Sequence, residues 1–278
     1  MNEPRVYRHS PLQFILLILV FGVLGIWIFA SFQEGRLPLL IPFGLFFLLI
    51  LSISLFSVTS RAILSDSEIT SQNLLGAKTL SWGEIHSVSG TGNAIKLHNL
   101  AGDITVTPSR NLPGYEEIIE EIGQKRPDLF SPQEHDEMTR NWLTRFIFPA
   151  IALLFTGAGI YFFIQQSEDG IILLVFFFVI AVVFLLSAIM SPQSITINDR
   201  SLQLKYLFSQ RTISADEIRS IAFLYYRTRN GKRYFIQLDL VDGKRIKLSG
   251  INPGLPIVYL TLKNWHKQSG PNTSLGRF

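Results

Sequence analysis

The side chains that most often carry out chemistry in proteins are sparse or poorly spaced in this sequence. There is no cysteine, which excludes disulfides, thiolate metal sites and cysteine nucleophiles. The histidines never fall at the spacing of metal ligands; they are His9, His86, His98, His135 and His266. The acidic run from Glu116 to Glu121 alternates with isoleucines at helical spacing, which indicates the solvated face of a helix. We therefore expect no enzyme, no cofactor and no metal.

The sequence does contain a cluster of side chains that could bind negatively charged groups. Seven cations lie close together near the C-terminus: Arg227, Arg229, Lys232, Arg233, Lys244, Arg245 and Lys247. They flank two predicted hairpin turns, so we expect one basic interaction surface. Three interpretations stay open: a solvated hairpin, contact with anionic lipid headgroups at about 1 kcal/mol per cation, or docking to an acidic protein surface. No RNA- or DNA-binding motif accompanies the cluster, so we expect no nucleic acid partner.

Four long apolar segments dominate the rest of the chain. Of its 278 residues, 47% are hydrophobic and only 17% charged. The uncharged windows are 10–33, 37–60, 146–167 and 170–198. About 20 helical residues at roughly 1.5 Å each span the ~30 Å core of a bilayer, so we predict four transmembrane helices and the lipid bilayer as a partner. The remaining chain is too short to wrap four such helices as a soluble core, and the first segment is longer than the apolar part of a signal peptide.

Charges beside these segments predict the topology. Arginines precede or follow each pair of segments; they are Arg5, Arg8, Arg61, Arg140, Arg145 and Arg200. The short turns at 31–36 and 165–170 lack such an excess. Because Lys and Arg accumulate on the cytoplasmic side, we expect both termini and both soluble segments to be cytoplasmic, in an inner-membrane protein. No ionisable residue lies within the spans, which disfavours transport by a single chain.

The chain contains an internal repeat at an offset of 133 residues. The offset superposes the apolar segments and, without a gap, a set of identical residues: Asp66/Asp199, Leu74/Leu207, Thr79/Thr212, Ser81/Ser214, Glu84/Glu217, Ile85/Ile218 and Ser87/Ser220. Copy two is longer by about eight residues around 225–232. Residues 58–144 hold seven Lys and Arg against twelve Asp and Glu, a net charge of −5, whereas residues 191–278 hold fourteen against five, a net charge of +9. We infer a duplication whose copies diverged in charge.

Alternation of apolar and polar residues predicts strands in the soluble segments. In copy two the alternating apolar positions are Leu202, Leu204, Tyr206 and Phe208, then Tyr234, Ile236, Leu238 and Leu240, then Ile246 and Leu248. Asn230-Gly231 and Asp242-Gly243 are strong hairpin signals. Copy one has shorter strands at 94–99 and 104–107 around Gly102. Each copy ends in a predicted helix, which in copy one buries Tyr115, Ile118, Ile119 and Ile122 and in copy two covers about 255–267.

These features together resemble a known family. The run from Ser81 to Val88 (Ser-Trp-Gly-Glu-Ile-His-Ser-Val), its counterpart from Ser214 to Ile221, the meander and the closing helix are similar to the bacterial pleckstrin-homology-like domain found behind transmembrane hairpins. Copy two has Ala215 where copy one has Trp82. The resemblance implies a bent antiparallel β sandwich or open barrel closed by a C-terminal helix, and a non-enzymatic scaffolding role.

The predicted fold class is therefore membrane α-helical plus α+β. Expected boundaries are a hairpin at 1–60, a pleckstrin-homology-like domain at 61–130, a linker at 131–144, a second hairpin at 145–192, a second domain at 193–268 and a disordered tail at 269–278. The leading functional hypothesis is an adaptor or assembly factor that binds a protein partner. The alternatives are an anionic-lipid sensor acting through the basic second domain and a subunit of an oligomeric transporter.

Overall fold

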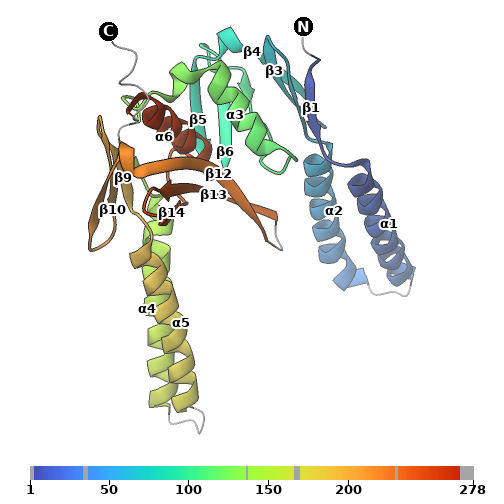
Figure 1. Cartoon of the computed structure of the whole chain (residues 1–278). Coiled ribbons are helices and arrows are strands. Elements are labelled where there is room, and N and C mark those ends of the chain that lie inside the picture. Colours follow the sequence, from blue (N-terminus) through green and yellow to red (C-terminus); the bar gives the residue numbers. More distant parts are fainter. Residues whose placement is uncertain (1–2, 34–36, 136, 166–169, 229–230, 270–278) are drawn as a thin grey trace, which may run out of the picture. The chain divides into compact units, whose positions relative to one another are not determined.

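A computed structural model describes residues 3–33, 37–135, 137–165, 170–228 and 231–269. The chain divides into two compact units that both contain helices and antiparallel sheets (Figure 1). Unit 1 comprises Met1–Val88 and Ala94–Lys125, and unit 2 comprises Ser89–Asn93 and Arg126–Phe278. Residues 34–36 and 166–169 of the two predicted turns and residues 270–278 of the predicted tail lie outside the described residues.

Unit 1 combines a helical hairpin with two sheets and a closing helix. Its elements are β1 (Arg5–Arg8), α1 (Pro11–Gln33), α2 (Leu37–Thr59), β2 (Arg61–Leu64), β3 (Glu68–Asn73), β4 (Gly76–Ser81), η1 (Trp82–Glu84), β5 (Ser87–Thr91), β6 (Ala94–His98), β7 (Thr105–Val106) and α3 (Tyr115–Lys125). The part of β5 from Ser89 onwards is grouped with unit 2 by its contacts. The strand orders are β1-β2-β3-β4 and β5-β6-β7.

Unit 2 has the same order of elements after a short 3-10 helix. Its elements are η2 (Pro127–Phe130), β8 (Glu137–Thr139), α4 (Trp142–Ile164), α5 (Gly170–Met190), β9 (Ser194–Ile197), β10 (Ser201–Lys205), β11 (Gln210–Ser214), η3 (Ala215–Glu217), β12 (Ile218–Thr228), β13 (Gly231–Leu240), β14 (Arg245–Leu248) and α6 (Leu255–Ser269). The strand orders are β11-β10-β9-β8 and β12-β13-β14.

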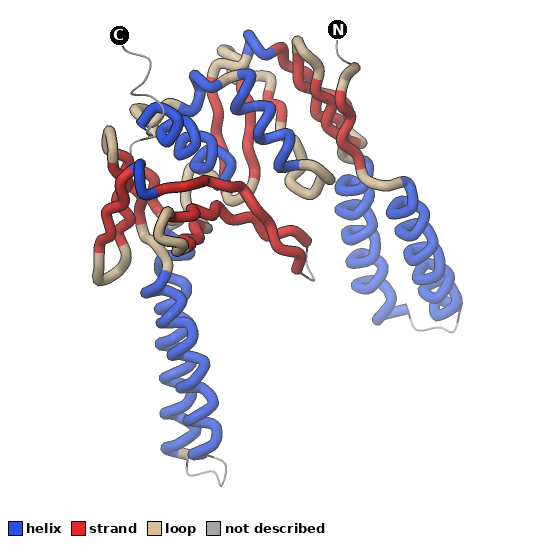
Figure 2. The backbone as a smooth tube through the Cα atoms, viewed as in Figure 1, coloured by secondary structure: helices blue, strands red, loops and turns tan. Residues whose placement is uncertain are grey.

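Each helical hairpin is inserted between two neighbouring strands of one sheet. In unit 1, β1 leads into α1, α2 leads into β2, and Arg8 pairs with Arg61 across the two strands. In unit 2, Thr139 of β8 pairs with Ser194 of β9 in the same way. Figure 2 shows that strands of these two sheets continue into a pair of helices each. The strands β1 and β8 fall in segments that the sequence analysis assigned to a hairpin and a linker, and it did not anticipate them.

The alternation predicted most of the buried positions correctly. Tyr234, Ile236, Leu238 and Leu240 are at most 3% exposed, and the closing helix of unit 1 buries its predicted stripe completely. The prediction is wrong at the end of one run, because β10 stops at Lys205. Tyr206 is only half-buried and Phe208 is 79% exposed, since both follow the strand and lie in the turn before β11. Alternation alone does not show where a strand ends.

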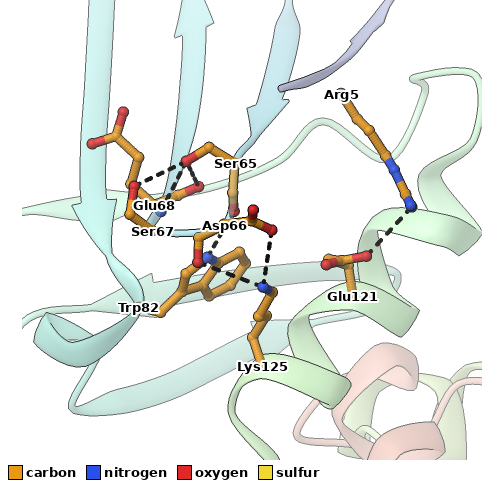
Figure 3. A network of polar contacts seen from close by, with 8 residues as sticks. All are labelled: Arg5, Ser65, Asp66, Ser67, Glu68, Trp82, Glu121 and Lys125. Atoms are coloured by element: carbon orange, nitrogen blue, oxygen red, sulfur yellow. Dashed lines mark hydrogen bonds and ion pairs between the residues drawn. The ribbon is translucent and has the colours of Figure 1, made fainter. Parts of the chain in front are cut away.

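One turn is fixed by the same kind of contacts in both units. In unit 1 the indole of Trp82 donates to the carbonyl of Ser65 at 3.0 Å, and Lys125 at the end of α3 donates to the carbonyl of Asp66 at 3.5 Å (Figure 3). In unit 2 the carbonyl of Asn198 accepts from the indole of Trp265 at 2.8 Å, and that of Asp199 from the hydroxyl of Ser269 at 2.6 Å. Ser65 and Asn198 are equivalent at the repeat offset. Ala215, which is equivalent to Trp82, cannot donate such a hydrogen bond. In unit 2 the indole of Trp265 on α6 donates it instead.

The helical hairpins expose apolar side chains on their surfaces. Among the described residues, two stretches are long and apolar enough to cross a membrane, Pro11–Ala30 and Gly170–Met190, and the shorter apolar stretches Gly44–Thr59 and Pro149–Ile164 belong to their partner helices. None of the first stretch is buried, and Val20, Trp27 and Phe29 are each more than half exposed. Two of the four predicted spans thus have the length and composition of membrane helices over the residues described.

Candidate interaction surface

The predicted cations lie mainly on the sheet β12-β13-β14 of unit 2. The β12–β13 ribbon is long, with strands of 11 and 10 residues where β5 and β6 have 5 each. The aromatic rings of Phe223 and Tyr234 stack at 4.9 Å, and Phe223 also stacks on Tyr259 of α6 at 5.4 Å. The closing helix therefore covers one face of this sheet, which we call the inner face. The opposite side is the outer face.

The outer face combines aromatic rings with cations. Cross-strand pairing places Tyr226 opposite Arg233, and Gln237 opposite Lys247. The ring of Tyr226 lies 5.9 Å from that of Phe235, and the ammonium of Lys247 lies 5.2 Å from the Phe235 centroid. A cation at this distance is attracted by the negative face of the ring. Leu224 and Tyr226 are 38% and 50% exposed, so the outer face offers apolar area as well as charge.

Two other cations lie on the inner-face side, at the end of the ribbon. Arg227 pairs with Lys232 across the strands, in register with Tyr225 opposite Tyr234. The ammonium of Lys232 lies 4.1 Å from the centroid of Tyr225 and 5.8 Å from that of Tyr234. Lys232 therefore lies over the end of a row of aromatic rings that starts at Tyr259 of α6 and continues through Phe223 and Tyr234 to Tyr225. These two cations point away from Arg233 and Lys247, because successive side chains alternate between the faces of a sheet.

Acidic neighbours compensate two more of the predicted cations. The guanidinium of Arg245 lies 3.4 Å from the carboxylate of Asp239, which also accepts from Ser220 and Gln237. Lys244 forms an ion pair with Asp242 at 2.9 Å, and hydrogen bonds from Lys244 lower the pKa of the Asp242 carboxyl. Arg229 lies outside the described residues. The structure thus gathers Arg233, Lys247 and Arg245 on the outer face and places the other described cations elsewhere.

In unit 1 the predicted acidic helix face is partly paired. Arg5 on β1 lies 3.5 Å from the carboxylate of Glu121 on α3 (Figure 3). The hydroxyl of Tyr7 donates to Glu117 at 3.1 Å, and partial burial together with this carboxylate raises the pKa of Tyr7. The strand before the hairpin therefore connects the sheet to the closing helix. Sequence reasoning missed these contacts because the partners are more than 100 residues apart.

The features of the described residues that suggest a function are groups that could bind another molecule. No group of three or more His, Asp or Glu side chains placed to hold a metal ion occurs among them. Arg227, Arg233 and Lys247 form no ion pair with another described residue. Cations that are exposed beside aromatic rings are suited to binding anionic groups or an acidic protein surface.

No protein-family model matches the chain, and no curated protein is significantly similar to it.

Proposed function

We propose that this protein is a non-enzymatic integral membrane protein with four transmembrane helices that presents two cytoplasmic β units to a protein partner. The exposed apolar surfaces of the helical hairpins support membrane insertion, because soluble proteins rarely leave such large apolar areas uncovered. Both ends of each hairpin enter adjacent strands of one sheet, which favours a hairpin that crosses the membrane and returns to the same side. The Lys and Arg bias beside the helices favours the cytoplasmic side.

We further propose that the two units are copies of one pleckstrin-homology-like domain with a membrane hairpin between its first two strands. The support is the shared strand order and the equivalent turn that two tryptophans bind. In this arrangement the sheets serve as rigid platforms above the membrane. An adaptor or assembly factor needs such a platform, since it contributes surfaces rather than reactions.

The observation that supports a protein partner is the composition of the outer face of β12–β14. Aromatic residues and arginine are enriched where proteins bind each other, and here the exposed Tyr226, the half-buried Phe235 and Arg233 lie together. An anionic membrane surface is the runner-up. The outer face offers two cations that form no ion pair with another described residue, Arg233 and Lys247, so a planar lipid surface would gain only about 2 kcal/mol from this face. The outer face therefore fits an acidic and partly apolar protein surface better.

Site-specific crosslinking in native membranes tests this proposal. A photoreactive phenylalanine at Tyr226 should crosslink the full-length protein to a partner protein in a defined ratio. The double substitution Arg233→Glu with Lys247→Glu should abolish this product, because it reverses the two outer-face cations that form no ion pair with another described residue. Arg227→Glu with Lys232→Glu is the matched control, since it reverses two charges on the other side of the same ribbon and should leave the product unchanged.

Three outcomes would contradict the proposal. Crosslinks to lipid alone would favour the lipid-sensing alternative. Equal loss with both double substitutions would indicate unspecific electrostatic attraction. A product formed only by copies of this chain around a pore would favour the transporter subunit.

A further inference from the structure

The two units share an unusual pair of turns with exposed apolar tips. Leu74 and Leu75 connect β3 to β4, and Leu207 and Phe208 connect β10 to β11. Their exposed fractions are 55%, 84%, 41% and 79% in that order. Tight turns are usually built from Gly, Pro, Asn, Asp and Ser. Apolar pairs at equivalent turns of both units therefore call for a physical reason, all the more because the units differ so much in charge.

Strand register places each tip at the end of the sheet where the helices begin. In unit 1, Gln72 of β3 pairs with Arg61, which lies two residues after the end of α2 and also pairs with Arg8 before α1. The strand then continues by one residue to Asn73 and turns. At about 3.4 Å per residue, the tip of Leu75 lies roughly 10 Å beyond Arg61, in the direction from which α2 arrives. Helix α2 and strand β3 are in contact, which fixes this arrangement.

Unit 2 repeats the arrangement with different residues. Lys205 at the end of β10 pairs with Ser194, the first residue of β9 after α5. Ser194 also pairs with Thr139, which precedes α4. The turn at Leu207 and Phe208 follows immediately, so its tip too lies beside the junction of sheet and helices (Figure 1). The other end of each sheet, at Ser67 and Arg200, lies one strand length away.

The side chains behind the tips fit the boundary between lipid and water. Lys78 and Arg211 are equivalent at the repeat offset and pair with Ser71 and Leu204, four residues before Leu75 and Phe208. Tyr206 adjoins the second tip and is half-buried. Tyrosine is enriched at membrane interfaces, and long basic side chains reach from apolar surroundings towards phosphate groups. In a lipid leaflet the acyl chains lie beneath the phosphate groups. An apolar tip followed by Lys78 or Arg211 has its apolar and cationic groups in the same order.

We infer that the two turns insert their apolar tips, Leu74 with Leu75 and Leu207 with Phe208, into the interfacial region of the bilayer and so hold each sheet down on the membrane. The inference rests on the proposed function, because it requires that the helices next to the turns cross the membrane. It explains why both copies keep exposed apolar residues at one turn. It also assigns the bilayer a second contact with each unit besides its helices.

A fluorescence measurement on the full-length protein in phosphatidylcholine and phosphatidylglycerol vesicles tests the inference. The chain has no cysteine, so single variants can each carry one thiol-linked NBD dye. Leu75→Cys and Phe208→Cys probe the tips, and both positions are exposed enough to tolerate a label. Ser67→Cys and Arg200→Cys are matched controls at the opposite ends of the same sheets. Val179→Cys in α5, which is 55% exposed, reports on the membrane helices.

The tip labels should show blue-shifted emission, quenching by nitroxide-labelled lipid and loss of quenching by aqueous iodide. The control labels should be quenched by iodide and not by the lipid. A blue shift without quenching by nitroxide lipid would mean that protein covers the tips and would overturn the inference, as would tip labels that behave like the controls. If the Val179 label also escapes quenching by lipid, the proposed membrane insertion itself fails, which separates the two failures.

Discussion

Trp82 and Trp265 come from different elements but donate to equivalent carbonyls, those of Ser65 and Asn198. The sequence shows only that Ala215 stands where a tryptophan would be expected. It cannot show the replacement, because Trp265 follows Asn198 by 67 residues and reaches it only through packing of α6 on the sheet. A part-buried indole hydrogen bond thus helps to hold the same turn in place in both units. Local patterns predict buried stripes well and long-range partners poorly.

Removing either indole donor should destabilise its unit. Trp82→Phe and Trp265→Phe each remove the indole donor of a part-buried hydrogen bond, which costs about 0.5–1.5 kcal/mol. Trp82 and Trp265 are 7% and 2% exposed. The measurement is the free energy of unfolding in detergent. Trp27→Phe is the control, since Trp27 is 64% exposed on α1 and its loss should change stability by less than about 0.5 kcal/mol. Wild-type stability in either variant would contradict the assigned role.

At the scale of elements, the sequence predicted the helices, the meander and the closing helices from periodicity. It did not predict β1 and β8, which have 4 and 3 residues. Such short segments carry little alternation, and each is separated from its partner strand by an entire helical hairpin. Sequence closeness also gave a wrong arrangement for the cations of β12–β14. Their closeness in sequence suggested one surface, but alternation along the strands divides them between two faces.

Packing within the second hairpin depends on one of its glycines. A Cβ atom at Gly159 would lie 3.3 Å from both Leu174 and Phe177 of α5, whereas at Gly157 it would meet nothing within 4 Å. Gly159→Leu should therefore push the helices apart and destabilise the hairpin by about 1–3 kcal/mol, the usual cost of overpacking. Gly157→Leu is the matched control and should have little effect. Thermal unfolding in detergent distinguishes them, and equal stability of both variants would refute the proposed packing role.

At the scale of the whole molecule, the account depends on both units lying on one side of the membrane. Each hairpin begins and ends in neighbouring strands, so in the proposed topology an even number of membrane crossings would precede every β segment. The charges in the sequence suggest this topology, and the pairing of the strands that flank each hairpin is consistent with the proposed return of the chain to the same side. The apolar tips at equivalent turns belong to the same picture, because they lie where sheet and helices meet in each unit.

The most direct test of this topology is thiol labelling of single-cysteine variants in intact cells with a membrane-impermeant reagent. Gln33→Cys and Gln166→Cys probe the two turns that the sequence predicts at 31–36 and 165–170, and Ser67→Cys and Arg200→Cys probe the two β units. The account predicts that the two hairpin positions react in intact cells and that the two β positions react only after the membrane is permeabilised. Reaction of Ser67→Cys or Arg200→Cys in intact cells, with protection of the hairpin positions, would contradict it.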